Sequence, residues 1–187
     1  MAENIRVAVF VGSLRAESYN RRLALALARL APETFTFEHV AIGDIPLYNQ
    51  DRDVNPPEAM TRLKHEVESA QALLFVTPEY NRGIPGVLKN ALDTASRPWG
   101  KNSFAGKPAG VVGISVGAIG TALAQHQLRN VLAYLDVPTL GQPEVYLQFS
   151  EGLLDDAGNI YKDDTRRFLQ GWVDAYVAWV RRFVAAS

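Results

Sequence analysis

The stretch VFVGSLRAESYNRRLALALARL, from Val9 to Leu30, begins as a buried strand and ends as an amphipathic helix. The helical part stops before Pro32, whose ring and missing N–H do not allow a helix to continue. Between the two parts lies GSLRAESYN, which sets hydroxyl, guanidinium and amide groups beside the free N–H groups of a helix start. A strand, a turn suited to an anion and a helix predict the first unit of an α/β fold.

The rest of the chain repeats this alternation of short apolar runs and longer amphipathic stretches. Strands are predicted at Ile5–Val11, Thr34–Val40, Leu73–Thr77, Ala109–Val116 and Val145–Leu147, and helices at Asn20–Ala31, Pro57–Ala70, Pro85–Ser96, Thr121–Tyr134 and Thr165–Val184. Runs such as ALLFV and GVVGISV show no polar alternation, as in strands covered on both faces of a parallel sheet. We therefore expect residues 1–187 to form one domain with a doubly wound parallel sheet and helices on both faces.

Composition limits the partners that the chain is expected to have. The net charge of -1 gives no electrostatic footprint for nucleic acid or anionic lipid, and no run approaches the length of a membrane span. The first residues read as a strand rather than a signal peptide, and the sequence contains no cysteine, which fits a reducing compartment. We expect a cytoplasmic protein with a small-molecule partner, no nucleic acid and no membrane.

Three loops follow the first, third and fourth predicted strands, where ligands bind in open parallel sheets. They are GSLRAESYN (Gly12–Asn20), PEYNRGIPG (Pro78–Gly86) and VGAIG (Val116–Gly120). The first loop is suited to a phosphate, although Ser18 or Asn20 could simply cap the helix. The side chains of this loop that suit an anion are Ser13, Arg15, Ser18, Tyr19 and Asn20.

Other phosphate motifs fail at specific positions. A P-loop is excluded because Glu17 stands at its second glycine and no lysine follows, and Leu14 breaks the dinucleotide fingerprint. GISVGAIG (Gly113–Gly120) also lacks that fingerprint, and close packing of backbone against a flat ligand explains its glycines equally well. A phosphoacceptor receiver would need acidic residues where Val11, Gly12, Thr77 and Pro78 stand.

The three loops together resemble the NADPH-dependent FMN reductase family, over about Val7 to Glu144. The resemblance rests on GSLRAESYN, TPEYNRGIPGVLKNALD and SVGAIG at this spacing. It implies a flavodoxin-like fold with strand order 2-1-3-4-5, noncovalent FMN, NAD(P)H as co-substrate, and a homodimer or homotetramer. Suitable contact surfaces between copies are the irregular loop Ala41–Pro57 and the helix Thr121–Tyr134.

The resemblance also implies a role for each loop. The first loop would hold the FMN phosphate and ribityl chain, with Arg15 and Asn20 in a solvent-facing position. The loop after the third strand, called the third loop, would line the isoalloxazine ring largely through backbone groups. The loop after the fourth strand, called the fourth loop, would close the other side of the ring. The implied cofactor-binding residues are Ser13, Leu14, Arg15, Ser18, Tyr19, Asn20, Pro78, Glu79, Tyr80, Asn81, Ser115, Val116 and Gly117.

The loops contain no His, Cys or acidic pair, and Glu79 is their one acid apart from Glu17, so the hard chemistry must belong to the cofactor. We expect no protein residue to act as acid or base. NAD(P)H would pass a hydride to flavin N5, and a quinone, chromate, ferric chelate or azo compound would then take the electrons in the same slot, by a ping-pong mechanism.

The alternative function is a flavodoxin-like electron carrier, but its docking would favour a one-signed surface that this charge balance lacks. The physiological acceptor and the choice between NADH and NADPH stay open. Arg82 either meets the nicotinamide nucleotide or faces solvent, and His126 with Glu144 falls near an implied subunit contact. His39 and His65 are expected to be ordinary surface residues, so no metal site is predicted, and Trp172, Tyr176 and Trp179 are expected to be structural.

Overall fold

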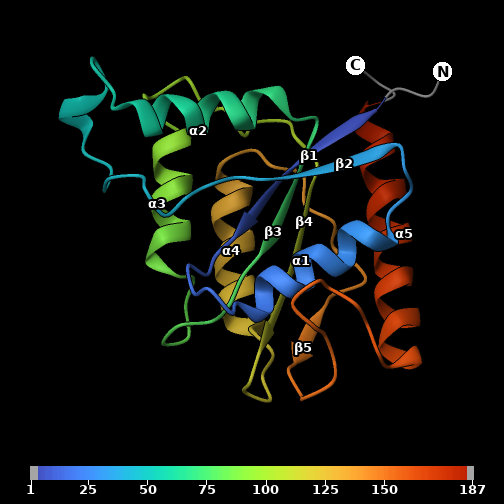
Figure 1. Ribbon diagram of the computed structural model, residues 1–187. Helices are drawn as coiled ribbons and strands as arrows, with labels where there is room; N and C mark the ends of the chain where they lie inside the picture. Colours follow the sequence, from blue (N-terminus) through green and yellow to red (C-terminus); the bar gives the residue numbers. More distant parts are fainter. Residues whose placement is uncertain (1–3, 185–187) are drawn as a thin grey trace.

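The computed structural model describes residues 4–184 and contains a five-stranded parallel sheet. The strand order β2-β1-β3-β4-β5 is the expected one (Figure 1). The elements are β1 (Ile5–Val11), α1 (Tyr19–Leu30), β2 (Phe35–His39), η1 (Gln50–Arg52), α2 (Glu58–Ser69), β3 (Ala72–Val76), α3 (Gly86–Ala95), β4 (Ala109–Ser115), α4 (Ala122–Tyr134), β5 (Tyr146–Gln148) and α5 (Asp163–Val184).

The helices cover both faces of the sheet, as the apolar strands predicted. Helices α1 and α5 pack on one face, and α2, α3 and α4 on the other, so each face has its own apolar core. Helix α5 approaches β4 closely because Gly110 has no side chain; an added Cβ there would lie 2.8 Å from Trp172. Trp172 and Tyr176 are buried and Trp179 is partly buried, which confirms their structural role.

The irregular connection between β2 and α2 is held by one buried side chain on α3. Asn90 accepts a hydrogen bond from the Tyr48 N–H at 2.8 Å and donates to the carbonyls of Ile45 and Pro46 at 3.2 and 3.1 Å. The connection also packs on the first loop, because a Cβ on Gly43 would lie 3.0 Å from Leu14. One buried amide thus fixes the base of a long loop.

The parallel strands bring the loops after β1, β3 and β4 to one edge of the sheet (Figure 1). Strand β3 ends at Val76, two residues before Pro78, which has no N–H to continue a ladder. No helix within residues 4–184 has the length and apolar character needed to cross a membrane.

Candidate functional site

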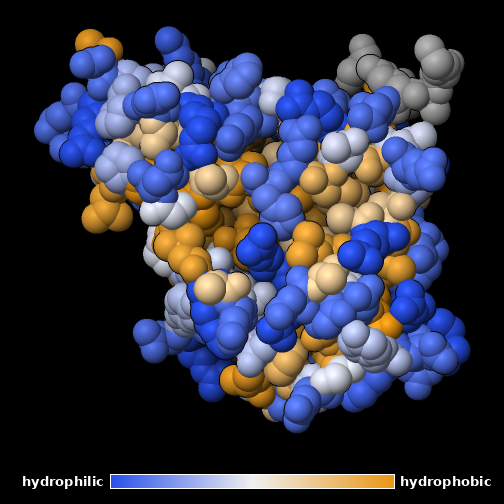
Figure 2. Space-filling view, viewed as in Figure 1, coloured by the Kyte–Doolittle hydropathy of each residue, from blue (hydrophilic) through white to orange (hydrophobic). Residues whose placement is uncertain are grey.

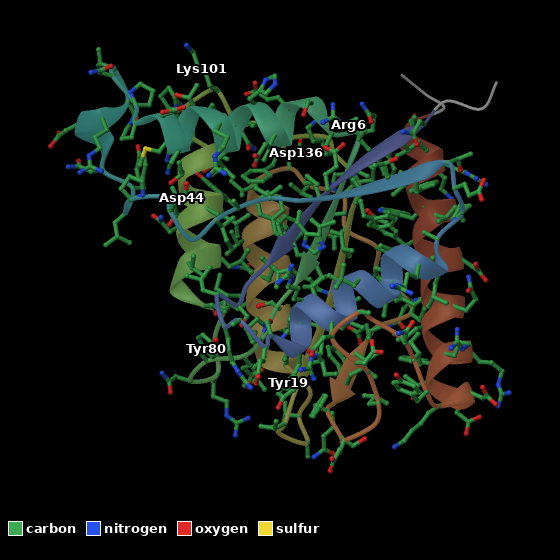
Figure 3. The ribbon with its side chains drawn as sticks, viewed as in Figure 1. Arg6, Tyr19, Asp44, Tyr80, Lys101 and Asp136 are labelled. Atoms are coloured by element: carbon green, nitrogen blue, oxygen red, sulfur yellow. The ribbon has the colours of Figure 1, made fainter. Side chains whose placement is uncertain are left out.

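The first and third loops touch each other at the carboxyl edge of the sheet. The Gly12 N–H donates to the Val76 carbonyl at 2.9 Å, and a Cβ on Gly12 would lie 3.1 Å from Pro78. Figure 3 shows Tyr19 and Tyr80, from these two regions, near the lower edge of the molecule, away from Arg6, Lys101 and Asp136. The edge that the sequence indicated is therefore one continuous surface.

Ser18 caps α1, because its hydroxyl oxygen accepts the Arg21 N–H at 3.2 Å. Ser18 therefore does cap the helix, and a hydroxyl that accepts one hydrogen bond can still donate another. The first N–H groups of the helix lack partners within the helix and carry the positive end of its dipole. Ser13 is half-buried and Arg15 exposed beside this helix start.

Arg15 is tied to its own loop by weak contacts. Its Nη2 lies 3.3 Å from a Glu17 carboxylate oxygen, and its guanidinium lies 5.0 Å from the centre of the Tyr19 ring. Contacts with Tyr19 and Glu17 raise the pKa of this guanidinium above its ordinary value, so it is a permanent cation at the edge. The Tyr19 ring also stacks on Phe149, with ring centres 3.7 Å apart. This stack joins the start of α1 to the segment after β5.

Asn20 differs from the expectation that it lies in a solvent-facing loop. It is the second residue of α1 and only 3% exposed. Its side chain donates to the Ile114 carbonyl at 2.9 Å and accepts the Ile114 N–H at 3.1 Å. The Gly113 N–H and the Ser115 carbonyl form their hydrogen bonds on the β5 side of β4. The N–H and carbonyl of Ile114, between them, therefore point to the other side of β4, where β3 has already ended. The Asn20 amide extends the ladder there, so its side chain is engaged within the protein.

The third loop forms a tight turn that projects Tyr80 from the surface. Tyr80 and Gly83 exchange two backbone hydrogen bonds of 3.0 Å, and the two residues between them have left-handed backbones, with φ 51° at Asn81 and 64° at Arg82. Gln127 on α4 accepts the Ile84 N–H at 2.8 Å. The turn is therefore fixed both within itself and to α4.

Glu79 caps α4 from the third loop. One carboxylate oxygen accepts the N–H groups of Leu123 and Ala124 at 3.0 and 3.1 Å, while Thr121, the residue before the helix, makes no side-chain cap. The other oxygen lies 3.8 Å from the Arg82 guanidinium. The acid therefore fixes the third loop to α4.

The glycines of GISVGAIG, at the end of β4 and in the loop after it, have reasons other than the flat ligand that their sequence suggested. A Cβ on Gly113 would overlap Thr121 and the Thr77 carbonyl, and one on Gly120 would lie 2.7 Å from the Tyr146 backbone. Gly117 is different, because a Cβ there would meet only the Ser115 hydroxyl, at 3.6 Å. That hydroxyl accepts the Gly117 N–H at 3.2 Å. The protein requires two of these glycines for its own packing, and Gly117 faces open space.

The edge also presents apolar side chains to solvent. Leu14, Tyr80 and Val116, one from each loop, are 61%, 52% and 67% exposed. Figure 2 shows apolar surface in the hollow between the upper-left lobe, which holds η1 and α2, and the loops at the lower edge. Exposed apolar groups beside fixed hydrogen-bond donors are typical of a site for a flat, partly charged ligand.

Other residues of interest lie away from this chemistry. His39, His65 and His126 are exposed, and Glu144 accepts a hydrogen bond of 2.6 Å from the Tyr146 hydroxyl rather than from His126. Burial and this bond raise the pKa of Tyr146 to about 12. Across residues 4–184, no cluster of three or more His, Cys, Asp or Glu side chains could hold a metal ion.

The edge carries the hydrogen-bond donors and the exposed apolar groups that FMN requires. The start of α1, Ser13 and Arg15 supply charge-assisted donors for a phosphate, and the space beside Gly117 and the exposed apolar residues suit an aromatic ring. A five-stranded sheet of this order with such a site defines a flavodoxin-like flavoprotein.

Comparison with known proteins identifies the family. The profile described as NADPH-dependent FMN reductase matches residues 5–152, and the chain belongs to this family. A 2-hydroxy-1,4-benzoquinone reductase from Burkholderia sp is 55% identical over 95% of this chain and 97% of its own. A quinone reductase from Pseudomonas putida is 49% identical over 97% of each chain.

A solved structure agrees with this membership. The flavoenzyme NAD(P)H:(acceptor) oxidoreductase FerB from Paracoccus denitrificans is 45% identical, has a TM-score of 0.92, and matches over 96% of this chain and 98% of its own. The expected fold, an oxidoreductase activity, and FMN with NAD(P)H as co-substrate are thereby confirmed. The electron-carrier alternative has no support in these relatives.

Proposed function

We propose that this protein catalyses the two-electron reduction of quinones by NAD(P)H at the carboxyl edge of its sheet. One NAD(P)H, one proton and one quinone give NAD(P)⁺ and one hydroquinone. The observation that carries the proposal is that the polar side chains Asn20 and Glu79 are bonded within the scaffold. What remains at the edge is backbone, apolar surface, hydroxyl groups and the permanent cations Arg15 and Arg82, which can bind a flavin and its partners but, apart from Glu17 beside Arg15, include no carboxylate or imidazole to act as an acid or base.

The first loop would hold the FMN phosphate. Ser13, the Ser18 hydroxyl, Arg15 and the N–H groups at the start of α1 are the donors that a phosphate dianion requires. Leu14 and Tyr19 lie beside them. Asn20 takes part through its backbone N–H because its side chain is bonded to Ile114.

The other two loops would hold the flavin ring. Pro78, Glu79, Tyr80 and Asn81 would contribute backbone groups from one side, and Ser115, Val116 and Gly117 from the other. FMN, when bound, accepts a hydride from NAD(P)H and passes two electrons to the acceptor. The protein orients both molecules, a contribution that can reach about 7–11 kcal/mol in favourable cases.

The acceptor class that we propose includes hydroxylated benzoquinones, because a relative with 55% identity is named for 2-hydroxy-1,4-benzoquinone. NAD(P)⁺ and the quinone would use the same exposed face in turn, which gives ping-pong kinetics. We propose chromate, ferric chelates and azo compounds as further substrates of the same site. An exposed flavin face can pass electrons to an acceptor that stacks on it or touches it, with few other contacts.

The test is a mixing experiment with the purified yellow protein in the absence of oxygen. NADH or NADPH alone should bleach the flavin within seconds, and 2-hydroxy-1,4-benzoquinone should then restore the colour. Parallel initial-rate patterns in both substrates should follow at steady state. A protein that stays yellow with both nucleotides contradicts the proposal. That result would favour the alternative function, a flavodoxin-like electron carrier.

We also propose a cytoplasmic homodimer or homotetramer. A groove of about 800 Å³ lies between α3 and α4, and the large side chains Trp99 and Tyr134 on its lining are exposed. Together with the predicted contact helix Thr121–Tyr134, this groove provides a surface that a second copy could cover. Light scattering at micromolar protein should give a mass above the 20.6 kDa of one chain, and a mass of 20.6 kDa contradicts the assembly.

A further inference from the structure

The turn after β3 places an arginine where the backbone favours glycine. Asn81 and Arg82 have φ 51° and 64°, and Tyr80 and Gly83 bond to each other across them. Such turns most often carry Asn-Gly, because asparagine tolerates the left-handed region whereas a long side chain is strained there. A glycine at position 82 would make this turn with less strain. Turn geometry therefore does not account for the Arg82 side chain, and strained residues of this kind gather at functional sites.

The backbone that carries Arg82 is held from three directions. The pair of bonds between Tyr80 and Gly83 closes the turn, Gln127 holds Ile84, and Glu79 holds the start of the loop to α4. The Arg82 guanidinium therefore extends from a fixed backbone, two residues along the turn from the exposed Tyr80.

The charge of Arg82 is available to a ligand. Its side chain is 62% exposed, and the Glu79 carboxylate oxygen nearest to it is 3.8 Å away. The other oxygen of Glu79 already accepts two N–H groups of α4. Glu79 is largely buried, but its contact with Arg82 is longer than a hydrogen bond, so the exposed guanidinium keeps its fork of donors.

We infer that Arg82 binds an oxygen anion on the molecule that exchanges electrons at this site. The inference rests on the proposed function. In a 2-hydroxyquinone the hydroxyl on C2 is a vinylogous acid of the C4 carbonyl and ionises readily, which leaves an oxyanion beside the neutral C1 carbonyl oxygen as an adjacent pair of acceptors. A guanidinium fork matches such a pair, as it matches a carboxylate. The phosphates of NAD(P)H carry the same chemistry and are the second possible source of the anion.

The test uses the oxidised protein with FMN bound and measures binding rather than turnover. Quenching of flavin fluorescence gives the Kd for 2-hydroxy-1,4-benzoquinone, for unsubstituted 1,4-benzoquinone, and for NADP⁺ and NAD⁺. In Arg82→Gly we expect the Kd for the hydroxyquinone to rise about 10-fold, as for a lost hydrogen bond to a charged group, and the Kd for benzoquinone to stay unchanged. Arg82→Lys should fall between the two because it keeps the charge and loses the fork.

Two controls separate this role from a structural one. Arg82→Gly should unfold at the same temperature as the wild type or higher, because glycine relieves the turn; Arg82→Asn, which also tolerates a left-handed backbone, is the second variant if Arg82→Gly does not fold. Arg181→Met removes an exposed arginine that lies over Phe35, at the start of β2 and thus at the opposite edge of the sheet. It should leave all four Kd values unchanged.

The outcomes assign the anion or reject it. A loss for the hydroxyquinone alone places Arg82 against the acceptor, a loss for NADP⁺ or NAD⁺ alone places it against a phosphate, and a loss for both indicates one shared face. Unchanged Kd values, or an equal loss for benzoquinone, overturn the inference. Wild-type protein that binds no FMN or does not oxidise NAD(P)H contradicts the proposed function instead, whatever Arg82 does.

Discussion

Replacing Asn20 by Ala should destabilise the fold rather than simply weaken FMN binding. The change removes two hydrogen bonds to Ile114, of 2.9 and 3.1 Å, from a side chain that is 3% exposed. The N–H and carbonyl of Ile114 in β4 then have no partner, because β3 ends before it reaches them. Each unpaired buried group costs about 1–3 kcal/mol. The free energy of unfolding should fall by about 2–6 kcal/mol, which at about 2–4 °C per kcal/mol corresponds to roughly 4–24 °C in Tm for a chain of this size.

Urea unfolding followed by circular dichroism measures this loss, on protein saturated with FMN and on protein freed of it. The midpoint should fall in both states, because the lost bonds belong to the scaffold. The matched control is Arg21→Ala at the next, exposed position, which should change stability by less than about 0.5 kcal/mol. If Asn20→Ala unfolds at the wild-type urea midpoint but binds FMN much more weakly, the reasoning is refuted. The Asn20 side chain would then be assigned to the FMN phosphate.

Three further changes test two other contacts at the edge and one in the loop before α5. Arg15→Ala should weaken FMN binding about 10- to 100-fold in a fluorescence titration, while Arg29→Ala, at the far end of α1, should not change it; equal affinities for both variants would remove Arg15 from the phosphate site. Glu79→Ala removes the cap of α4 and should lower stability by about 1–2 kcal/mol in urea, and an unchanged midpoint would mean that the cap contributes nothing. The hydrogen bonds from Asn159 lower the pKa of Asp155 to about 2, below its unfolded value of about 3.9, so Asp155 stabilises the fold above that unfolded value and loses this effect as the pH falls toward 2. Asp155→Ala should therefore have a lower Tm than wild type at pH 7, and the difference should narrow below pH 4; a constant difference at all pH values would contradict the assignment.

The sheet and its order could be predicted because the strands are continuous apolar runs with clear ends. The bounds of β1 agree with the prediction. Each end of the other strands differs from the prediction by one residue, except the start of β4, which agrees. Helix α5 begins at Asp163 rather than Thr165, and the two acidic residues in its first turn are a signal that the prediction did not use. Pro32 correctly marked the end of α1, and Ser18 its cap.

The roles of single polar side chains in the site could not be predicted. Asn20 bonds to a residue 94 positions away, and Glu79 to residues 44 and 45 positions away. Local propensity gives an asparagine at a helix start the role of a cap or an anion ligand, and nothing near it in the sequence reveals a strand end that needs a donor and an acceptor. The loops could be located from the sequence, but the partners of their side chains depend on tertiary packing.

The side-chain hydrogen bonds that hold the loops in place have a consequence for the binding of FMN. Because Asn20, Glu79 and Gln127 hold the edge through the protein's own backbone, arrival of FMN has little chain left to order. The entropy that a disordered loop would lose on binding is then small, so more of the contact energy appears as affinity. We therefore expect the protein without FMN to keep its fold and to bind the cofactor without a folding step.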